Sequence, residues 1–279
     1  MELKITTLVE NTVKDRSLLG EHGLSFHIQA DNKSIIFDTG QGMSLHHNAS
    51  LLNINLNDIS SIVLSHGHYD HTGGLKRLID RDIPGSIPGK MPLTIRAHQG
   101  VFMEKYKKSN NHYKEIGMPA SIKDSLHSSI KIILNKEPVE IEKNIYLTGE
   151  IPEVKKNDGF YTLNNQNEYI PDSFRDEQAL FIKTPKGLVV ILGCAHTGII
   201  NTLEHIKSLT DDNIYAVLGG THLLNAREQE LIETVEKIKE LNINTIGLCH
   251  CTGIDSYAYL KSKLPHRVYY TCTGSEFLL

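Results

Sequence analysis

Short apolar runs separated by turn-forming residues fill the first third of the chain. Runs of four to eight residues bounded by Gly, Pro, Asn or Asp are typical of β-strands, whereas apolar residues three or four apart indicate a helix face. We predict strands at 3–9, 24–30, 34–37 and 61–64 and a short helix at 50–56. Leu75, Leu78 and Ile79 then mark one face of a helix that begins near Gly73.

The last third alternates strands with helices, which favours an α/β fold. We predict strands at 179–183, 188–192, 214–218 and 245–248, and a helix carrying Ile199, Leu203, Ile206 and Leu209. A second helix follows, with Asn225 as its expected N-cap and Glu228 completing a capping box.

The middle of the chain is the least regular part. Residues 82–89 carry two Pro-Gly pairs and are expected to form a loop, and 101–113 reads as a helix or a flap. We predict one domain, 1–279, with an irregular insertion at about 80–130. This insertion is either a lid that supplies substrate specificity or a solvated segment without a role, and the pattern leaves both open.

Composition narrows the class of protein. The 279 residues carry a formal net charge of −4, which argues against a general binder of nucleic acids or anionic membranes, and a nuclease is disfavoured for the same reason. No apolar run approaches the ~18 residues that span a bilayer, and the first residues do not resemble a signal peptide. We therefore expect a cytoplasmic protein with a small-molecule substrate; homo-oligomerisation stays open.

The segment His66-Gly67-His68-Tyr69-Asp70-His71 carries most of the chemistry visible in the sequence. Neutral imidazole and carboxylate are preferred ligands of zinc, manganese and iron. His66 and His68 can turn toward one point, and Asp70 and His71 toward a second. Two metal ions about 3.5–4 Å apart can polarise a substrate oxygen and activate water, so two divalent ions are expected.

An H-x-H-x-D-H segment after a strand, preceded by a strand that ends in Asp38-Thr39-Gly40, resembles the metallo-β-lactamase superfamily. The resemblance implies a four-layer αββα sandwich in which two mixed β-sheets have helices outside. Further segments resemble the branch that includes a methanopterin-pathway enzyme, which joins a dihydropterin to a ribofuranosylaminobenzene phosphate. These segments are 21–25, 65–75, 146–152, 193–199 and 219–223.

The resemblance also implies the metal ligands. His66 and His68 would hold the first ion, and Asp70, His71 and His250 the second, with zinc expected and manganese or iron as alternatives. Asp38 would orient the histidine loop through hydrogen bonds.

The chain departs from the superfamily pattern at two positions. Glu150 lies where a histidine is common, and Cys194 lies where an aspartate is common. We expect His196 to replace the missing aspartate as a ligand, and whether Glu150 or Cys194 also binds metal stays open. His222, after Gly219-Gly220, is expected to contact the substrate.

These features predict a metal-dependent hydrolase in which a metal-bound hydroxide attacks a small, phosphorylated substrate. Asp70 would both bind metal and orient the nucleophile, so Asp70 and His222 are the expected catalytic residues. One alternative is a dihydropterin-transferring synthase of the methanopterin-pathway type, in which the metals activate a diphosphate leaving group. Another is a non-catalytic ligand-binding or sensing protein with a vestigial metal site.

Overall fold

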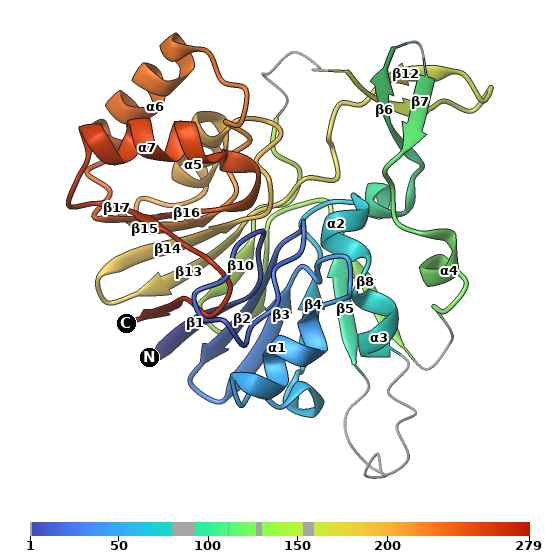
Figure 1. Ribbon diagram of the computed structural model, residues 1–279, viewed down its shortest axis with the longest axis horizontal. Coiled ribbons are helices and arrows are strands. Elements are labelled where there is room, and N and C mark those ends of the chain that lie inside the picture. The colour runs from blue at the N-terminus through green and yellow to red at the C-terminus, as the bar shows by residue number, and fades with distance from the viewer. Residues whose placement is uncertain (1, 80–92, 111, 127–129, 153–158) are drawn as a thin grey trace. The chain divides into compact units, whose positions relative to one another are not determined.

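The computed structural model describes residues 2–79, 93–110, 112–126, 130–152 and 159–279 (Figure 1). The chain forms two compact units, each made of segments that are far apart in the sequence. The amino-terminal unit contains Glu2–Asn135, Lys156–Asp176 and Cys272–Leu279, and the carboxy-terminal unit contains Lys136–Lys155 and Glu177–Thr271.

The main sheet of the amino-terminal unit is mixed, with the strand order β18-β1-β2-β3-β4-β5-β8 among the described residues. Neighbours from β18 to β3 are antiparallel, and those from β3 to β8 are parallel. The strands are β1 (Leu3–Val9), β2 (Ser25–Ala30), β3 (Lys33–Phe37), β4 (Ser61–Val63), β5 (Thr94–Ala97), β8 (Lys131–Leu134) and β18 (Glu276–Leu278). The parallel half matters for function, because the carboxyl ends of parallel strands meet at one edge of a sheet.

Short helices share one apolar core with this sheet. They are α1 (Leu45–Leu51), α2 (Tyr69–Thr72), α3 (Leu75–Ile79) and α4 (Ala120–Lys123), with 3-10 turns at Leu56–Asp58 and Gln99–Phe102. Leu45 of α1, Leu78 of α3 and Ile122 of α4 are buried in the same cluster as Ile62 of β4. The helix predicted at 50–56 is therefore misplaced: the helix begins at Leu45 and ends at Leu51, and the apolar residues beyond it lie in a turn.

A separate antiparallel sheet with the order β12-β11-β6-β7 also belongs to the amino-terminal unit. Its strands are β6 (Lys105–Ser109), β7 (His112–Glu115), β11 (Phe160–Leu163) and β12 (Tyr169–Pro171). Of the helix or flap expected at 101–113, the helix is wrong after Phe102, because the residues there pair as the antiparallel strands β6 and β7. On one face the Tyr113 and Tyr169 rings stack with centroids 3.7 Å apart. The loop expected at 82–89 lies outside the described residues.

The carboxy-terminal unit contains a second mixed sheet, with the order β17-β16-β15-β14-β13-β10-β9 in the part of the chain that the structure describes. The run from β14 to β17 is parallel and the remaining pairs are antiparallel. The strands are β9 (Val139–Glu142), β10 (Ile145–Leu147), β13 (Leu180–Thr184), β14 (Gly187–Leu192), β15 (Ile214–Gly219), β16 (Thr245–Leu248) and β17 (Val268–Tyr270).

The helices that cover this sheet in the described part of the unit are α5 (Ile199–Leu209), α6 (Glu228–Glu240) and α7 (Ile254–Lys263) (Figure 1). Leu203, Val235 and Leu260, one from each helix, are buried in a single apolar cluster with the strands. The predicted cap at Asn225 is wrong, because α6 begins later: the Arg227 amide donates to the Glu230 carboxylate at 3.0 Å. Among the described residues, no helix is long and apolar enough to cross a membrane.

The α/β class with two mixed sheets and flanking helices is confirmed. The strands predicted in the first and last thirds are present to within a residue or two. The apolar residues of these strands are almost completely buried.

One buried histidine in β2 makes folding sensitive to acid. Burial, assisted by the charge of Lys4, lowers the pKa of His27 from 6.5 to about 4. Between these values the unfolded chain binds more protons than the folded one, so stability falls as the pH drops from 6.5 toward 4. At pH 5 this single group is expected to lower the free energy of unfolding by about 2 kcal/mol.

His27→Gln retains a hydrogen-bonding group toward Ser34. Between pH 8 and pH 5 the free energy of unfolding of this variant should therefore fall by about 2 kcal/mol less than that of the wild type. Urea unfolding of both metal-free proteins at the two pH values measures the difference. Equal losses would show that His27 is not the titrating group.

Candidate metal centre

The histidine segment leaves the carboxyl end of β4 and is held by Asp38, which follows the neighbouring strand β3. One Asp38 oxygen accepts a hydrogen bond from the Ser65 amide at 2.7 Å, and the other accepts from Ser65 Oγ at 2.7 Å and lies 2.6 Å from His71 Nδ1. The expectation that Asp38 orients this loop is confirmed. Such a carboxylate fixes the tautomer of a histidine and directs Nε2 toward a ligand.

The three imidazoles of the segment form a tight, buried group. Ring centroids are 4.6 Å apart for His66 and His68 and 4.2 Å apart for His66 and His71. His66 Nε2 lies 3.0 Å from His68 Nδ1, close to the ~3.3 Å that separates two nitrogens bound tetrahedrally to one zinc ion. The donor set and its spacing therefore fit a divalent metal ion.

The protonation state of these rings also fits. Burial, with the neighbouring His71 and His68, lowers the pKa of His66 well below 6.5. Burial, with the charge of Lys105, lowers the pKa of His68 to about 3. Both rings are therefore neutral near pH 7, and the neutral imidazole is the form that binds metal.

Asp70 and His71 lie in the short helix α2, directly after its N-cap His68, where the sequence predicted a loop. The Asp70 side chain is only 11% exposed, and its Oδ2 lies 3.1 Å from His22 Nε2. Sequence reasoning gave His22 no role, but its ring contacts a predicted catalytic carboxylate. The available signal was its place in the segment 21–25, which was part of the family resemblance.

A buried ion cluster contacts the backbone of the histidine segment. Lys105 Nζ lies 2.8 Å from a carboxylate oxygen of both Asp172 and Asp176. The other Asp176 oxygen accepts a hydrogen bond from the amide of Gly67, between the first two histidines, at 2.8 Å. Gly67 leaves room for this contact, because a Cβ there would lie 2.5 Å from the Val101 carbonyl. Sequence reasoning missed this cluster, because Lys105 lies 67 and 71 residues before its two aspartates.

The remaining predicted residues lie in the carboxy-terminal unit, at the carboxyl ends of three adjacent parallel strands. Cys194 and His196 follow β14, His222 follows β15, and His250 follows β16. The His196 and His222 rings are 4.3 Å apart. The buried Glu177 carboxylate accepts hydrogen bonds from the His196 and Thr197 amides, at 2.6 and 2.7 Å. The sheet thus brings His196 and His222 together.

Two cysteines accompany His250 at this edge. Ligand atoms of Cys194, His250 and Cys251 all lie within 4.8 Å of one another. Burial alone raises the pKa of the Cys251 thiol, but hydrogen bonds from Cys194 and His222 and the nearby His250 ring hold it well below its ordinary value. Backbone strain accompanies the cluster, since Ala195, His222 and His250 have φ of 54°, 52° and 52°. Such conformations concentrate at functional sites.

Glu150 follows β10 and lies 3.7 Å from Lys136 Nζ in an ion pair. Its role as a ligand stays a prediction. The histidines and carboxylate of residues 66–71 thus form one group in the amino-terminal unit. His196, His222 and His250 gather at one sheet edge in the carboxy-terminal unit.

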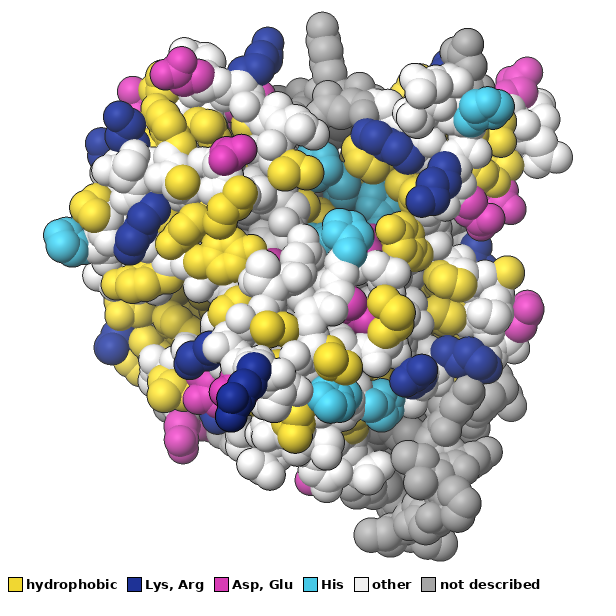
Figure 2. All heavy atoms as spheres, in the orientation of Figure 1, with side chains coloured by type: hydrophobic (Ala, Val, Ile, Leu, Met, Phe, Trp, Pro, Cys, Tyr) yellow, Lys and Arg dark blue, Asp and Glu magenta, His cyan; other side chains and the backbone are white. Residues whose placement is uncertain are grey.

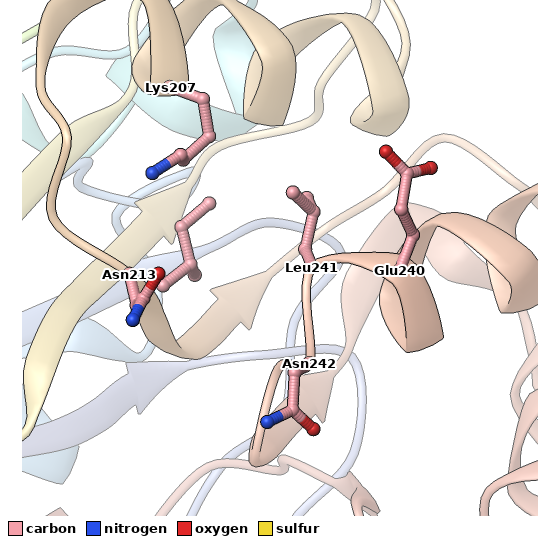
Figure 3. Close-up of a pocket in the computed structure, with 6 residues that line it drawn as sticks. Lys207, Asn213, Glu240, Leu241 and Asn242 are labelled. Atoms are coloured by element: carbon pink, nitrogen blue, oxygen red, sulfur yellow. The ribbon is translucent and has the colours of Figure 1, made fainter.

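A pocket in the carboxy-terminal unit lies at the opposite ends of the parallel strands. It is lined by Lys207, Asn213, Ile214, Glu240, Leu241 and Asn242 (Figure 3). Ile214 begins β15, whereas His222 follows the end of that strand, so this pocket is separate from the histidines. The Lys207 ammonium donates to the carbonyls of Asp211 and Asp212, which gives it a structural role.

Charges of both signs are interspersed on the face shown in Figure 2. That distribution agrees with the modest net charge of the chain, −4, and gives no sign of a basic stripe among the side chains described on that face.

The chain is similar to known proteins over most of its length. The 7,8-dihydropterin-6-methyl-4-(beta-D-ribofuranosyl)-aminobenzene-5'-phosphate synthase of Methanocaldococcus jannaschii is 32% identical over 266 residues, which cover 90% of this chain and 88% of that protein. The uncharacterized protein MJ0448 of the same organism is 34% identical over 267 residues, with 95% and 96% covered.

The crystal structure of Tm1679, a metal-dependent hydrolase of the beta-lactamase superfamily, is 29% identical, with a TM-score of 0.82 and with 99% of this chain and 98% of that chain covered. The family model of the metallo-beta-lactamase superfamily matches residues 19–150, which include the histidine segment and Asp38. On this similarity, and with the histidine segment in place, the chain belongs to the metallo-β-lactamase superfamily.

Proposed function

We propose that this protein is a metal-dependent hydrolase of a small, phosphorylated substrate. The observation that carries the proposal is the group formed by His66, His68 and His71. These rings are buried, and burial keeps His66 and His68 neutral. Ser65 Oγ contacts His66 Nδ1, and Asp38 contacts His71 Nδ1. This preorganisation is what a catalytic metal site requires. The superfamily supports it, because its members are mostly enzymes and usually bind divalent metal.

The proposed roles follow the predicted chemistry. A bound divalent ion would polarise a substrate oxygen and acidify water at this site. His66, His68, Asp70 and His71 are proposed as ligands, with His196 and His250 completing the set as the family resemblance implies. Asp70 would also orient the attacking water, and His22 is placed to hold the Asp70 carboxylate. His222 would donate a hydrogen bond to the substrate.

A second candidate is a synthase that joins a dihydropterin to a ribofuranosylaminobenzene 5'-phosphate. The similarity to the Methanocaldococcus jannaschii enzyme of that name favours it. In this reaction the carboxylates and imidazoles would hold ions that neutralise a diphosphate leaving group. Hydrolase and synthase would therefore share ligands and differ in the nucleophile, which is water in one and the amino nitrogen of the aminobenzene in the other.

The proposal predicts turnover that depends on the histidine segment. Metal-free protein is reloaded with Zn, Mn or Fe and offered a phosphodiester, a phosphomonoester, a lactone and a thioester. In parallel, it is offered a dihydropterin diphosphate together with a ribofuranosylaminobenzene phosphate. Hydrolysis of a phosphate ester by the loaded protein supports the hydrolase, and pyrophosphate release that requires both partners supports the synthase.

His68→Gln should abolish whichever activity appears, and His112→Gln is the matched control. His112 is an exposed histidine of β7 in the same unit, so its replacement should leave turnover unchanged. If no combination of metal and substrate is turned over, and the purified protein retains an organic ligand but little metal, a sensing role replaces both candidates.

A further inference from the structure

The carboxy-terminal unit contains a group of thiols that the proposed ligand set does not use. Cys194 follows β14 and Cys251 follows β16, and the strand between them, β15, ends beside both. Cys194 is 4% exposed. The Cys194 and Cys251 sulfurs and a ring nitrogen of His250 all lie within 4.8 Å of one another. Three donors from two strand ends therefore converge on one point.

Backbone contacts fix the position of the Cys251 sulfur. The His222 amide donates a hydrogen bond to Sγ at 3.3 Å, and Sγ lies 3.5 Å from the Cys194 carbonyl oxygen. Gly220 is required on the third side, because a Cβ at that position would lie 2.6 Å from the sulfur. The sulfur thus occupies a space that the neighbouring strand end leaves open.

The spacing of the donors suits a metal ion. Zinc binds sulfur at about 2.3 Å and nitrogen at about 2.0–2.1 Å, so two sulfurs on one tetrahedral ion are ~3.8 Å apart. The observed limit of 4.8 Å therefore requires a contraction of about 1 Å or less, which side-chain rotation can supply. Sulfur and imidazole ligands select zinc and other borderline or soft ions over Mg or Ca.

We propose that Cys194, His250 and Cys251 bind one divalent zinc-like ion through two thiolates and one imidazole. The proposal rests on the proposed metal-dependent function and specifies the ligands near His250. It accounts for the cysteine at position 194, where the superfamily commonly has aspartate. These three donors leave a fourth tetrahedral position for a further ligand.

Cobalt substitution tests the proposal directly. Metal-free, reduced full-length protein is titrated with Co(II), and thiolate ligation produces a near-ultraviolet charge-transfer band that imidazole and carboxylate ligands do not produce. The wild type should show this band, and Cys194→Ser and Cys251→Ser should each lose about half of its intensity, one of two thiolates being removed. Cys272→Ser is the matched control, since Cys272 lies in the other unit, and its band should be unchanged.

Two results would overturn the proposal. One is visible cobalt bands without the charge-transfer band in the wild type, which would place cobalt on nitrogen and oxygen ligands alone and leave the proposed function intact. The other is a Cys194–Cys251 disulfide in the purified protein, detected by mass spectrometry. Cadmium-113 NMR of the wild type gives a second measurement that needs no variant: a resonance in the range of thiolate ligation supports the site, and its absence from cadmium-loaded protein excludes it.

Discussion

Asp70→Asn is expected to abolish turnover while leaving the fold intact. Asparagine keeps the size of the side chain but removes the charge that makes a carboxylate a strong ligand for a divalent ion. Loss of a residue that only supports a metal ligand costs about 10–100-fold in activity or affinity, so loss of a ligand that also orients the nucleophile should cost more than about 100-fold in kcat/KM. The measurement uses the substrate that the wild type turns over, together with the metal content of both proteins.

The fold should survive because the backbone contact of this residue is retained and an asparagine oxygen can still accept a hydrogen bond from His22. The Asp70 carbonyl accepts a hydrogen bond from the Leu24 amide at 3.2 Å, and an Asn side chain does not change it. Asp124→Asn is the matched control, since Asp124 is an exposed carboxylate just after α4 in the same unit. Undiminished turnover in Asp70→Asn, with unchanged metal content, would rule out Asp70 as a ligand and as the orienting group.

The part of the site that the sequence predicted has a local signal. A buried strand followed at once by His66 and His68 places the two rings at a strand end, and Asp38 follows the next strand in the same way. In a parallel sheet such ends meet at one edge, so residues almost thirty positions apart could be expected to meet. The same logic brings His196 and His222 together in the carboxy-terminal unit.

The parts that were missed depend on pairing that leaves no local pattern. The strand β6 reads as polar, Lys-rich chain, and its antiparallel pairing with β7 and with β11, more than fifty residues later, makes it a strand. The ion cluster of Lys105, Asp172 and Asp176 follows from that pairing. The helix alternative for 101–113 is wrong for the same reason, because tertiary pairing overrides weak intrinsic propensity.

Lys105→Met is expected to have the largest effect on stability. The Lys105 side chain is 3% exposed and those of its partners Asp172 and Asp176 are 7% and 2% exposed. Removing the cation leaves two buried carboxylates without their counter-charge. Breaking a buried ion pair in this way lowers the free energy of unfolding by about 3–5 kcal/mol. Chemical unfolding in the presence of a chelator measures the change without a contribution from metal. Lys108→Met, an exposed lysine of the same strand, is the control and should change stability by less than about 1 kcal/mol.

The pH dependence of this loss separates charge from packing. Burial alone raises the pKa of Asp176, but the Lys105 charge lowers it below its ordinary value, so in the wild type the pair contributes stability at neutral pH that is lost as the pH falls through that lowered pKa. Without Lys105 the same burial raises the carboxylate pKa, and the protein is destabilised only while the carboxylates stay charged. The difference in unfolding free energy between wild type and Lys105→Met should therefore shrink between pH 8 and pH 5, and His27 contributes equally to both proteins and cancels.

Adding Asp172→Asn and Asp176→Asn to Lys105→Met should restore part of the stability at pH 8, because no buried charge then remains. A difference that is the same at both pH values would assign the loss to the packing of the lysine stem. The Asp176 carboxylate also accepts a hydrogen bond from the Gly67 amide. If the loss depends on pH, Lys105→Met should therefore also bind metal more weakly at the histidine segment.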